Sequence, residues 1–376
     1  MTAQTFDGFV LTRNWRDTPS GVELEFWFAS NAGPLCVVVR GERSVFFLPL
    51  RDYERAGAVL SRYADVQTRE LPLRDFTMQP VMGLYFTQHR AARRCVDELK
   101  ALGLDPLEAD INPAERYLME RFVYGAASLH GEARRRGRYV TLENPQWRPS
   151  AYRPRLKVVS FDIETAMEGL ELYSIAAHGR CPGQEDVRQV FMIDPAGEPS
   201  PAAHTQILPT QEQALEAFLD WLDTYDPDVL VGWNIVNFDT RYLQRVADHL
   251  GRRLLLGRDR RPGHWRALDE EEQRFSVQFP GRVILDGIEL LRAAFYRFES
   301  FSLENVGREL LGEGKLLHGA DRGEEIGRLF REDKVRLAAY NLRDCELVTE
   351  IFAETQLLDF AVARSAMTGL NVDRMG

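Results

Sequence analysis

The stretch Lys157 to Thr165, K-V-V-S-F-D-I-E-T, decides the fold of this chain. Its first half is apolar, β-prone and free of Gly and Pro, which is typical of a strand buried in a sheet that is covered on both faces. Asp162 and Glu164 are two residues apart, so both carboxylates point to the same side of the strand. Because neighbouring acids repel each other, we expect a hard cation such as Mg²⁺ or Mn²⁺ between them. Taken alone, the pair is also explained by a capping aspartate beside a solvent-exposed glutamate.

The bulk composition indicates a globular protein of two or three domains, because 376 residues with 44% hydrophobic content can bury a sizeable core. The first 16 residues include Asp7 and Arg13 and hold no long apolar run, so neither a signal peptide nor any membrane contact is expected. A cytoplasmic location is the default prediction. The cysteines are far apart and form no C-x-x-C pair, which predicts reduced core thiols rather than disulfides or a zinc site: Cys36, Cys95, Cys181 and Cys345.

A net charge of −10 ordinarily disfavours a nucleic-acid partner, but the charge is unevenly distributed. Residues 131–157 contain eight basic and two acidic side chains, interleaved with Tyr139, Trp147 and Tyr152. Such a segment predicts either a strand-binding surface that combines phosphate contacts with base stacking or a solvent-exposed linker face.

Residues 1–150 are predicted to form a β-rich α+β domain. Four apolar runs separated by turn residues indicate an antiparallel meander over 8–12, 22–29, 35–39 and 44–48. A helix is expected over 90–102, and a second begins after Asn112, where Pro113 and Glu115 fit a capping box. The three prolines of 144–154 indicate a linker.

Residues 151–360 are predicted to form an α/β domain with a mixed sheet and flanking helices, because strand and helix patterns alternate. Strands are expected at 157–163, 171–176, 187–193 and 228–231, and helices at 210–224, 237–250, 302–312 and 332–358. The runs 275–279 and 282–285, separated by Pro280-Gly281, are expected to pair as a hairpin.

Two further segments contain acids that are predicted to act together with Asp162 and Glu164. Asp239 closes the segment 232–239, G-W-N-I-V-N-F-D, just beyond a strand end, where sites form in α/β sheets and a helix dipole favours a carboxylate. Tyr340 and Asp344 are spaced i, i+4, so the phenol and the carboxylate share one helix face. Taken separately, Asp239 is also compatible with an ordinary acid at a helix start, and the pair Tyr340 and Asp344 with a surface hydrogen bond. Together, four carboxylates balance two divalent cations, which suit phosphoryl hydrolysis with Tyr340 orienting the attacking water.

Three segments resemble the exonuclease motifs of family B DNA polymerases: S-F-D-I-E-T (160–165), G-W-N-I-V-N-F-D (232–239) and Y-N-L-R-D-C-E-L-V (340–348). Three others are similar to the bacterial polymerase II branch of that family: L-T-R-N-W-R-D-T-P (11–19), P-A-E-R-Y-L-M-E-R-F (113–122) and S-F-S-L-E-N-V-G-R-E-L-L-G-E-G-K (300–315). The resemblance covers nearly the whole chain.

The resemblance implies an RNase H-like 3′ to 5′ exonuclease domain over 151–360, preceded by a template-side domain over 1–150 and followed by 361–376, the start of a connection to a palm domain. It implies that two Mg²⁺ or Mn²⁺ ions bind to Asp162, Glu164, Asp239 and Asp344, with Tyr340 also catalytic. Asn234 and Phe238 would lie near the 3′ terminal nucleotides. Asp286 is not expected to be a ligand, and the 275–285 hairpin resembles the element that parts the primer end from the template.

The palm-domain patterns D-x-x-S-L-Y-P and Y-x-D-T-D do not occur in this sequence. The expectation is therefore the N-terminal part of a proofreading polymerase that serves DNA replication and repair, able to hydrolyse but not to incorporate nucleotides. Its expected partners are single-stranded or frayed DNA 3′ ends, the template strand, palm, fingers and thumb domains, and a sliding clamp bound through the missing part. The alternatives are a stand-alone 3′ to 5′ exoribonuclease and a non-catalytic template-binding module.

Overall fold

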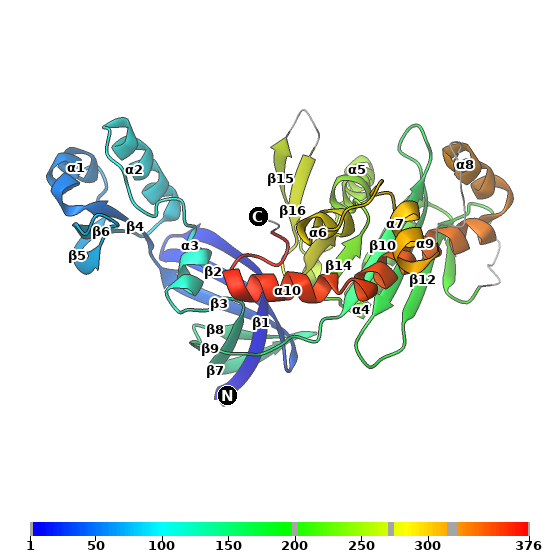
Figure 1. Ribbon diagram of the computed structural model, residues 1–376, viewed down its shortest axis with the longest axis horizontal. Helices are drawn as coiled ribbons and strands as arrows, with labels where there is room; N and C mark the ends of the chain where they lie inside the picture. Colours follow the sequence, from blue (N-terminus) through cyan, green and yellow to red (C-terminus); the bar gives the residue numbers. More distant parts are fainter. Residues whose placement is uncertain (1–2, 198–201, 270–273, 314–321, 375–376) are drawn as a thin grey trace. The chain divides into compact units, whose positions relative to one another are not determined.

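The computed structural model describes residues 3–197, 202–269, 274–313 and 322–374 (Figure 1). The chain divides into two compact units, Met1–Arg153 and Pro154–Gly376, which are considered separately below. The last two residues of the polymerase II-like stretch 300–315 and of the segment 361–376 lie outside the described residues.

The first unit is built on a sheet that closes on itself. β1, β2 and β3 pair antiparallel in succession, and β3 continues to β8 in parallel. β7 then pairs with β8 and also with β1, which completes the ring, while β9 adds to β7. The strands are β1 (Ala3–Thr18), β2 (Gly21–Ser30), β3 (Gly33–Glu42), β7 (Ala126–Arg136), β8 (Tyr139–Glu143) and β9 (Gln146–Pro149).

The fourth strand predicted for the meander belongs to a different sheet, so that part of the prediction is wrong. β4 (Ser44–Pro49) pairs with β6, not with β3. Its sheet has its own core, in which Phe46 and Phe86 stack with ring centroids 5.6 Å apart. A second hydrophobic core therefore interrupts the first unit, formed with β5 (Gln67–Arg74), β6 (Pro80–Phe86), the short turn Leu50–Asp52, α1 (Tyr53–Leu60) and α2 (His89–Ala101).

The predicted cap of α3 (Pro113–Met119) is confirmed, because the Asn112 side chain accepts a hydrogen bond from the Glu115 amide at 3.0 Å. The predicted linker 144–154 is wrong in part, since β9 lies within it and pairs with β7. Trp147 of β9 packs against Phe26, with ring centroids 5.2 Å apart. The Trp147 ring of the basic segment 131–157 therefore packs against the hydrophobic core and does not form a base-stacking surface.

The second unit contains the predicted mixed sheet, with strand order β13-β12-β11-β10-β14-β17. β10 pairs antiparallel with β11 and parallel with β14, and β14 pairs parallel with β17. The strands are β10 (Val158–Thr165), β11 (Leu172–Arg180), β12 (Val187–Ile193), β13 (Thr205–Leu208), β14 (Val229–Gly232) and β17 (Val283–Asp286). This architecture confirms the α/β fold class.

Helices cover both faces of this sheet. The apolar residues Val159, Phe161 and Ile163 of β10 pack with α4 (Gln211–Tyr225) and α5 (Arg241–His249). On the opposite face, α8 (Arg322–Glu332) and α9 (Lys334–Glu354) cover β11 and β12. Strand alternation therefore directs the side chains between these apolar positions toward α9. The predicted helix 332–358 is divided, since Gln356 has φ of 52° and α10 (Leu357–Thr368) follows it.

The predicted hairpin 275–285 is wrong in its pairing. β16 (Arg274–Gln278) pairs antiparallel with β15 (His264–Asp269), and the two lie side by side in Figure 1. The apolar run after Pro280-Gly281 instead enters the main sheet as β17. Two helices follow, α6 (Gly287–Ala293) and α7 (Leu303–Leu311), and Ser302 caps α7 as predicted.

All four cysteines are free, and three of them are buried. Among the helices of the described residues, none combines the length and the apolar character needed to cross a membrane.

Candidate active site

Three acidic side chains from two elements lie together at the face of β10 that α9 covers. Asp162 and Glu164 come from the strand, and Asp344 comes from the helix. One carboxylate oxygen from each lies within 4.8 Å of the other two. Glu164 and Asp344 are buried, so these charges are largely withdrawn from water. The i, i+2 spacing on the strand and the inward face of the helix bring the three acids into one cluster.

Asn341 holds the Asp162 carboxylate in place. Its side-chain amide donates to Asp162 Oδ2 at 2.7 Å, and its oxygen accepts from the Ser174 hydroxyl at 2.9 Å. Asn341 and Ser174 are fully buried. Because a buried amide with both ends bonded has little freedom to rotate, this chain of hydrogen bonds fixes the orientation of the first acid.

Asp239 lies next to this cluster, on the π-helical turn Val236–Thr240 that precedes α5. It accepts a hydrogen bond from the amide of Ile163, the residue between the two strand acids, at 3.2 Å. Burial raises the pKa of Asp239 well above its ordinary value, and the charge of Asp162 raises it further. The fourth predicted acid is therefore electrostatically linked to Asp162, although it is not one of the three acids whose oxygens lie within 4.8 Å of one another.

The chain reverses sharply between β14 and this turn. A Cβ on Gly232 would lie 2.7 Å from the Ile235 Cβ, and Asn234 has φ of 61°, a conformation that asparagine tolerates better than most residues. Asn234 is exposed, and Phe238 is 47% exposed. Both predicted DNA-contact residues are thus accessible, and Phe238 directly precedes the buried Asp239.

Tyr340 and Asp286 differ from each other in their surroundings. Tyr340 is fully buried in the cluster of apolar residues between α8, α9 and the sheet. Asp286 caps α6 by accepting a hydrogen bond from the Ile288 amide at 2.9 Å, and burial raises its pKa to about 6. The capping contact gives Asp286 a structural role.

The acids are suited to a divalent cation. Their donor atoms are all carboxylate oxygens, which Mg²⁺ and Mn²⁺ prefer. Oxygens on opposite sides of a Mg²⁺ ion are about 4 Å apart, so a cluster spanning at most 4.8 Å needs only a small contraction. A bound cation would also offset the repulsion that raises the pKa of Asp239.

Comparison with protein families agrees with this geometry. Residues 105–306 match the family model of the DNA polymerase family B exonuclease domain, which is more than half of the chain. The chain belongs to DNA polymerase family B. Residues 8–42 match the N-terminal model of DNA polymerase II, and residues 44–104 match its insertion domain. The insertion match coincides with the separate core that begins at β4, which explains why β4 leaves the first sheet.

Individual relatives within family B support the same assignment. The chain is 44% identical to DNA polymerase II of Escherichia coli (strain K12), over 98% of this chain and 46% of that protein. It is 27% identical to a DNA polymerase of Desulfurococcus sp. (strain Tok), over 73% of this chain and 32% of that protein. The chain thus spans less than half the length of these curated relatives. The solved family B DNA polymerase of Pyrobaculum calidifontis shares the fold, with a TM-score of 0.77 at 21% identity, over 98% of this chain and 48% of that structure.

Sequence analysis missed Asn341 and Ser174 as partners of the first acid. Asn341 lies inside the quoted motif 340–348, but its neighbour Asp162 is 179 residues away in sequence. The available signal was its position three residues before Asp344, which puts both side chains on one face of the helix.

Proposed function

We propose that this chain is a 3′ to 5′ exodeoxyribonuclease that removes nucleotides from single-stranded or frayed DNA ends with Mg²⁺ or Mn²⁺. The observation that carries the proposal is the convergence of Asp162, Glu164 and Asp344, with Asp239 electrostatically linked to Asp162, in a chain of family B. Burying several carboxylates together is costly unless a partner of opposite charge lies between them.

Each group of residues has a separate proposed role. Asp162, Glu164, Asp239 and Asp344 would hold two divalent cations, which supply an activated water and stabilise negative charge on the departing 3′ oxygen. Asn341 keeps the Asp162 carboxylate in one orientation through its bond to Ser174. Tyr340 is proposed to orient the attacking water, and Asn234 and Phe238 to contact the terminal nucleotides.

We propose further that this hydrolysis proofreads the product of a longer polymerase, because DNA polymerase II of Escherichia coli extends well beyond the matched region. Residues 1–150 would lie near the template strand, 151–360 would carry the exonuclease, and 361–376 would lead toward palm, fingers and thumb domains. Binding of a sliding clamp stays a sequence-based prediction, since the clamp contact is expected outside residues 1–376. The cytoplasmic location stays a sequence-based prediction as well.

The test is digestion of a 3′-labelled DNA oligonucleotide by the 376-residue chain, with Mg²⁺ or Mn²⁺ and with EDTA. We expect label release that EDTA abolishes, and a loss of at least about a hundredfold when Asp162 and Glu164 are both replaced by alanine. A matched control replaces Glu354 and Asp359, two exposed acids of the same unit, and should digest like the wild type.

Two results would overturn the proposal. One is an unchanged rate for the Asp162→Ala, Glu164→Ala variant, which would place the activity elsewhere. The other is digestion of an RNA 3′ end faster than the matching DNA end, which would support an exoribonuclease instead.

A further inference from the structure

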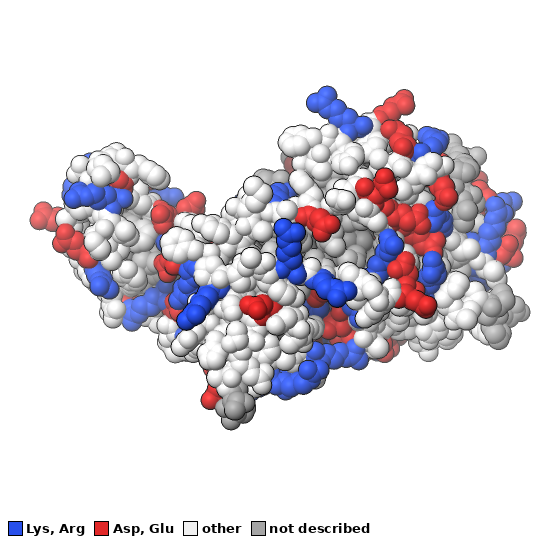
Figure 2. Space-filling model, turned by 60° about the horizontal axis from the view of Figure 1, so that its bottom comes forward, with Lys and Arg blue, Asp and Glu red and all other residues white. Residues whose placement is uncertain are grey.

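Four arginines gather at the tip of the hairpin that β7 and β8 form in the first unit. Arg134, Arg135 and Arg136 end β7, and Arg138 lies in the turn before β8. All four are exposed. The nearest acid before them in sequence is Glu132, although the chain as a whole has a net charge of −10. Over most of the face shown in Figure 2, by contrast, acidic and basic side chains are interspersed. The proposed hydrolysis uses none of these arginines.

The tip extends beyond the strands that flank it. β1 pairs with β7 as far as Glu132, and β3 pairs with β8 from Val140 onward. Among the described residues, the backbone between these two points pairs within the hairpin itself. Gly137 begins the two-residue loop and has φ of 55°, a conformation that favours glycine and that tight hairpin loops require. The arginines are therefore held on a short, regular, two-stranded ribbon.

The charge of the tip is not neutralised by neighbouring acids. No carboxylate of the described residues forms an ion pair with Arg134, Arg135 or Arg136. Glu143, at the far end of β8, pairs with Arg40 at 2.7 Å instead. Strand alternation puts Arg134 and Arg136 on one face of the ribbon. Two guanidinium groups on one face repel each other, so a ligand with closely spaced negative charges would stabilise both.

The tip offers this charge without a surface for stacking bases. Apart from Tyr139, residues 126–143 contain no Phe, Trp or Tyr. The Tyr139 ring is partly buried and packs against Trp27 of β2, with ring centroids 4.8 Å apart. Proteins that bind single strands usually combine cations with aromatic rings that stack on the bases. The tip therefore fits a ligand that presents phosphates but not the faces of its bases.

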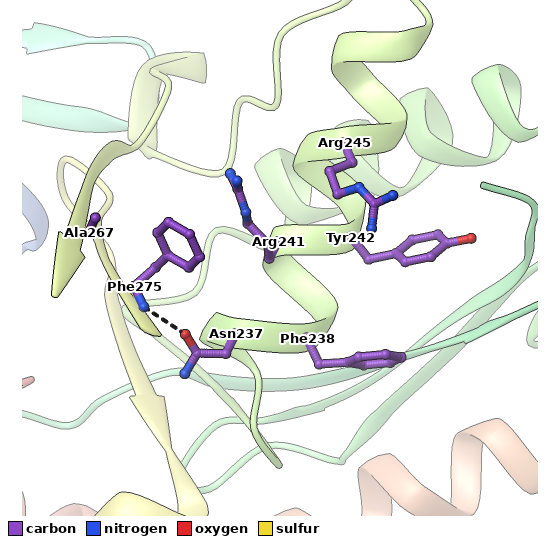
Figure 3. A pocket seen from close by; sticks show the side chains of 7 residues that line it. All are labelled: Asn237, Phe238, Arg241, Tyr242, Arg245, Ala267 and Phe275. Atoms are coloured by element: carbon purple, nitrogen blue, oxygen red, sulfur yellow. Dashed lines mark hydrogen bonds between the residues drawn. The ribbon is translucent and has the colours of Figure 1, made fainter. Parts of the chain in front are cut away.

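A pocket of the second unit shows the opposite arrangement (Figure 3). Arg241 and Phe275 line it, and the guanidinium lies over the ring, 4.4 Å from the ring centroid. The pocket also includes Phe238, the residue before Asp239, and so belongs to the candidate active site. Unpaired bases can stack on rings of this kind. The β7–β8 tip thus differs in chemistry from the surface next to the acids.

Double-stranded DNA keeps its bases stacked inside and presents its phosphates outward, so arginines alone can hold it. Its major groove is also wide enough to admit a two-stranded β-ribbon. We propose that the tip of the β7–β8 hairpin binds the phosphates of double-stranded DNA, with Arg134 and Arg136 as the main contacts. DNA as the ligand agrees with membership of family B. The contact is separate from hydrolysis, because it lies in the first unit and involves none of the four acids.

The experiment measures binding of a 5′-fluorescein-labelled blunt duplex of about 20 base pairs by anisotropy, in EDTA so that no hydrolysis occurs. The double variant Arg134→Gln, Arg136→Gln should weaken binding about tenfold at low salt. The slope of log affinity against log salt should fall by about 1.8, because each phosphate contact on B-DNA contributes about 0.9. Binding of an oligothymidylate of the same length should weaken less than about threefold, since its bases can stack in the second unit.

The matched control is the double variant Arg69→Gln, Arg94→Gln, which makes the same change in net charge at two exposed arginines of the first unit. It should bind the duplex within about twofold of the wild type, because charges away from the contact act only through the screened field of the protein. Both double variants keep polar side chains at exposed positions, so both should fold.

Three results would overturn the proposal. The Arg134→Gln, Arg136→Gln variant could bind the duplex like the wild type, the control could lose as much affinity, or the single strand could lose as much affinity as the duplex. Failure of the proposed function would show separately, as a wild-type chain that binds the duplex through these arginines but releases no label from a DNA 3′ end with Mn²⁺.

Discussion

Asn341 connects the helix of the site to its strand, and its removal should affect the metal more than the fold. Leucine has nearly the shape of asparagine but cannot donate to Asp162. We expect Asn341→Leu to weaken Mn²⁺ binding about tenfold or more, because partners that orient metal ligands have effects of about 10- to 100-fold. Isothermal titration with Mn²⁺ measures this directly.

The control for this prediction is Asn305→Leu, which changes a hydrogen-bonded asparagine on the exposed part of α7. It should leave Mn²⁺ affinity unchanged. Equal affinities for wild type and Asn341→Leu would show that Asp162 is oriented without this contact.

His178 on β11 makes the stability of the second unit depend on pH. The ring is buried, and its Nδ1 lies 2.7 Å from the Thr349 hydroxyl. Burial lowers the pKa of His178, and this outweighs the opposing effect of Asp186, whose carboxylate lies 3.4 Å from Nε2. The other charged groups that face it are Glu346, Arg188 and Arg180.

A histidine whose pKa is lowered by folding is more readily protonated in the unfolded chain. Stability should therefore be complete above about pH 6.5 and should fall as pH drops below that value, by at most about 1.4 kcal/mol per pH unit for one proton. Urea unfolding at about pH 7.5 and 5.5 measures the loss. His178→Gln retains a polar group for Thr349 and should show a smaller difference; an equal difference would assign the pH dependence to other groups.

At the residue scale, Asp162, Glu164 and Asp344, which the structure brings together, could be selected from the sequence because each lies in a short motif whose local geometry is set by the strand or helix around it. Strand alternation alone puts Asp162 and Glu164 on one side, and helical spacing alone puts Asn341 and Asp344 on one face. Which motifs meet depends on the order of strands in the sheet. The acids were grouped by their shared chemistry, and the family resemblance then supported that grouping.

At the scale of elements, the wrong hairpin shows what local patterns omit. The residues on both sides of Pro280-Gly281 are β-prone, and a single bridge between Phe279 and Arg282 is what remains of the predicted pairing. β17 reads V-I-L-D with its first three residues buried, which suits a strand in a sheet that helices cover on both faces, although β17 is at the edge of that sheet. β15 is largely exposed, so its sequence lacks the apolar alternation that indicates a half-buried strand.

Arg258 contacts residues that precede β14 and β17 in the chain, and it should be needed for stability. It is buried, and its guanidinium bonds to Asp226 Oδ1 at 2.9 Å and to Asp228 Oδ1 at 2.7 Å. Burial acts to lower its pKa, but the two aspartates more than offset this and the pKa is raised. Arg258→Leu leaves the aspartates buried without this partner, which should cost about 3 kcal/mol in the free energy of unfolding.

Chemical denaturation of the variant checks this value, with Arg253→Leu as the control. Arg253 is exposed, so its replacement should change stability by less than about 0.5 kcal/mol. A loss of under about 1 kcal/mol for Arg258→Leu would mean that Arg282, which also bonds to Asp226 at 3.1 Å, compensates for the missing charge.

At the scale of the whole molecule, the two units have separate hydrophobic cores, so a ligand of one unit need not stabilise the other. The proposed cations bind only folded carboxylates of the second unit. At a Mn²⁺ concentration about a hundred times the dissociation constant, the ion should stabilise that unit by about 2.7 kcal/mol. The sequence could not show this independence, because it follows from which residues share a core.

Hydrogen exchange with and without Mn²⁺ tests this prediction on the intact chain. We expect amides of β10, β11 and α9 that exchange through unfolding of the unit to slow about a hundredfold, since 1.4 kcal/mol corresponds to a factor of ten. Amides of β1, β2 and β3 should exchange as before. Asp162→Ala, which removes one ligand, should show little or no slowing in either unit; equal slowing in both units of the wild type would mean that Mn²⁺ binds elsewhere or that the units unfold together.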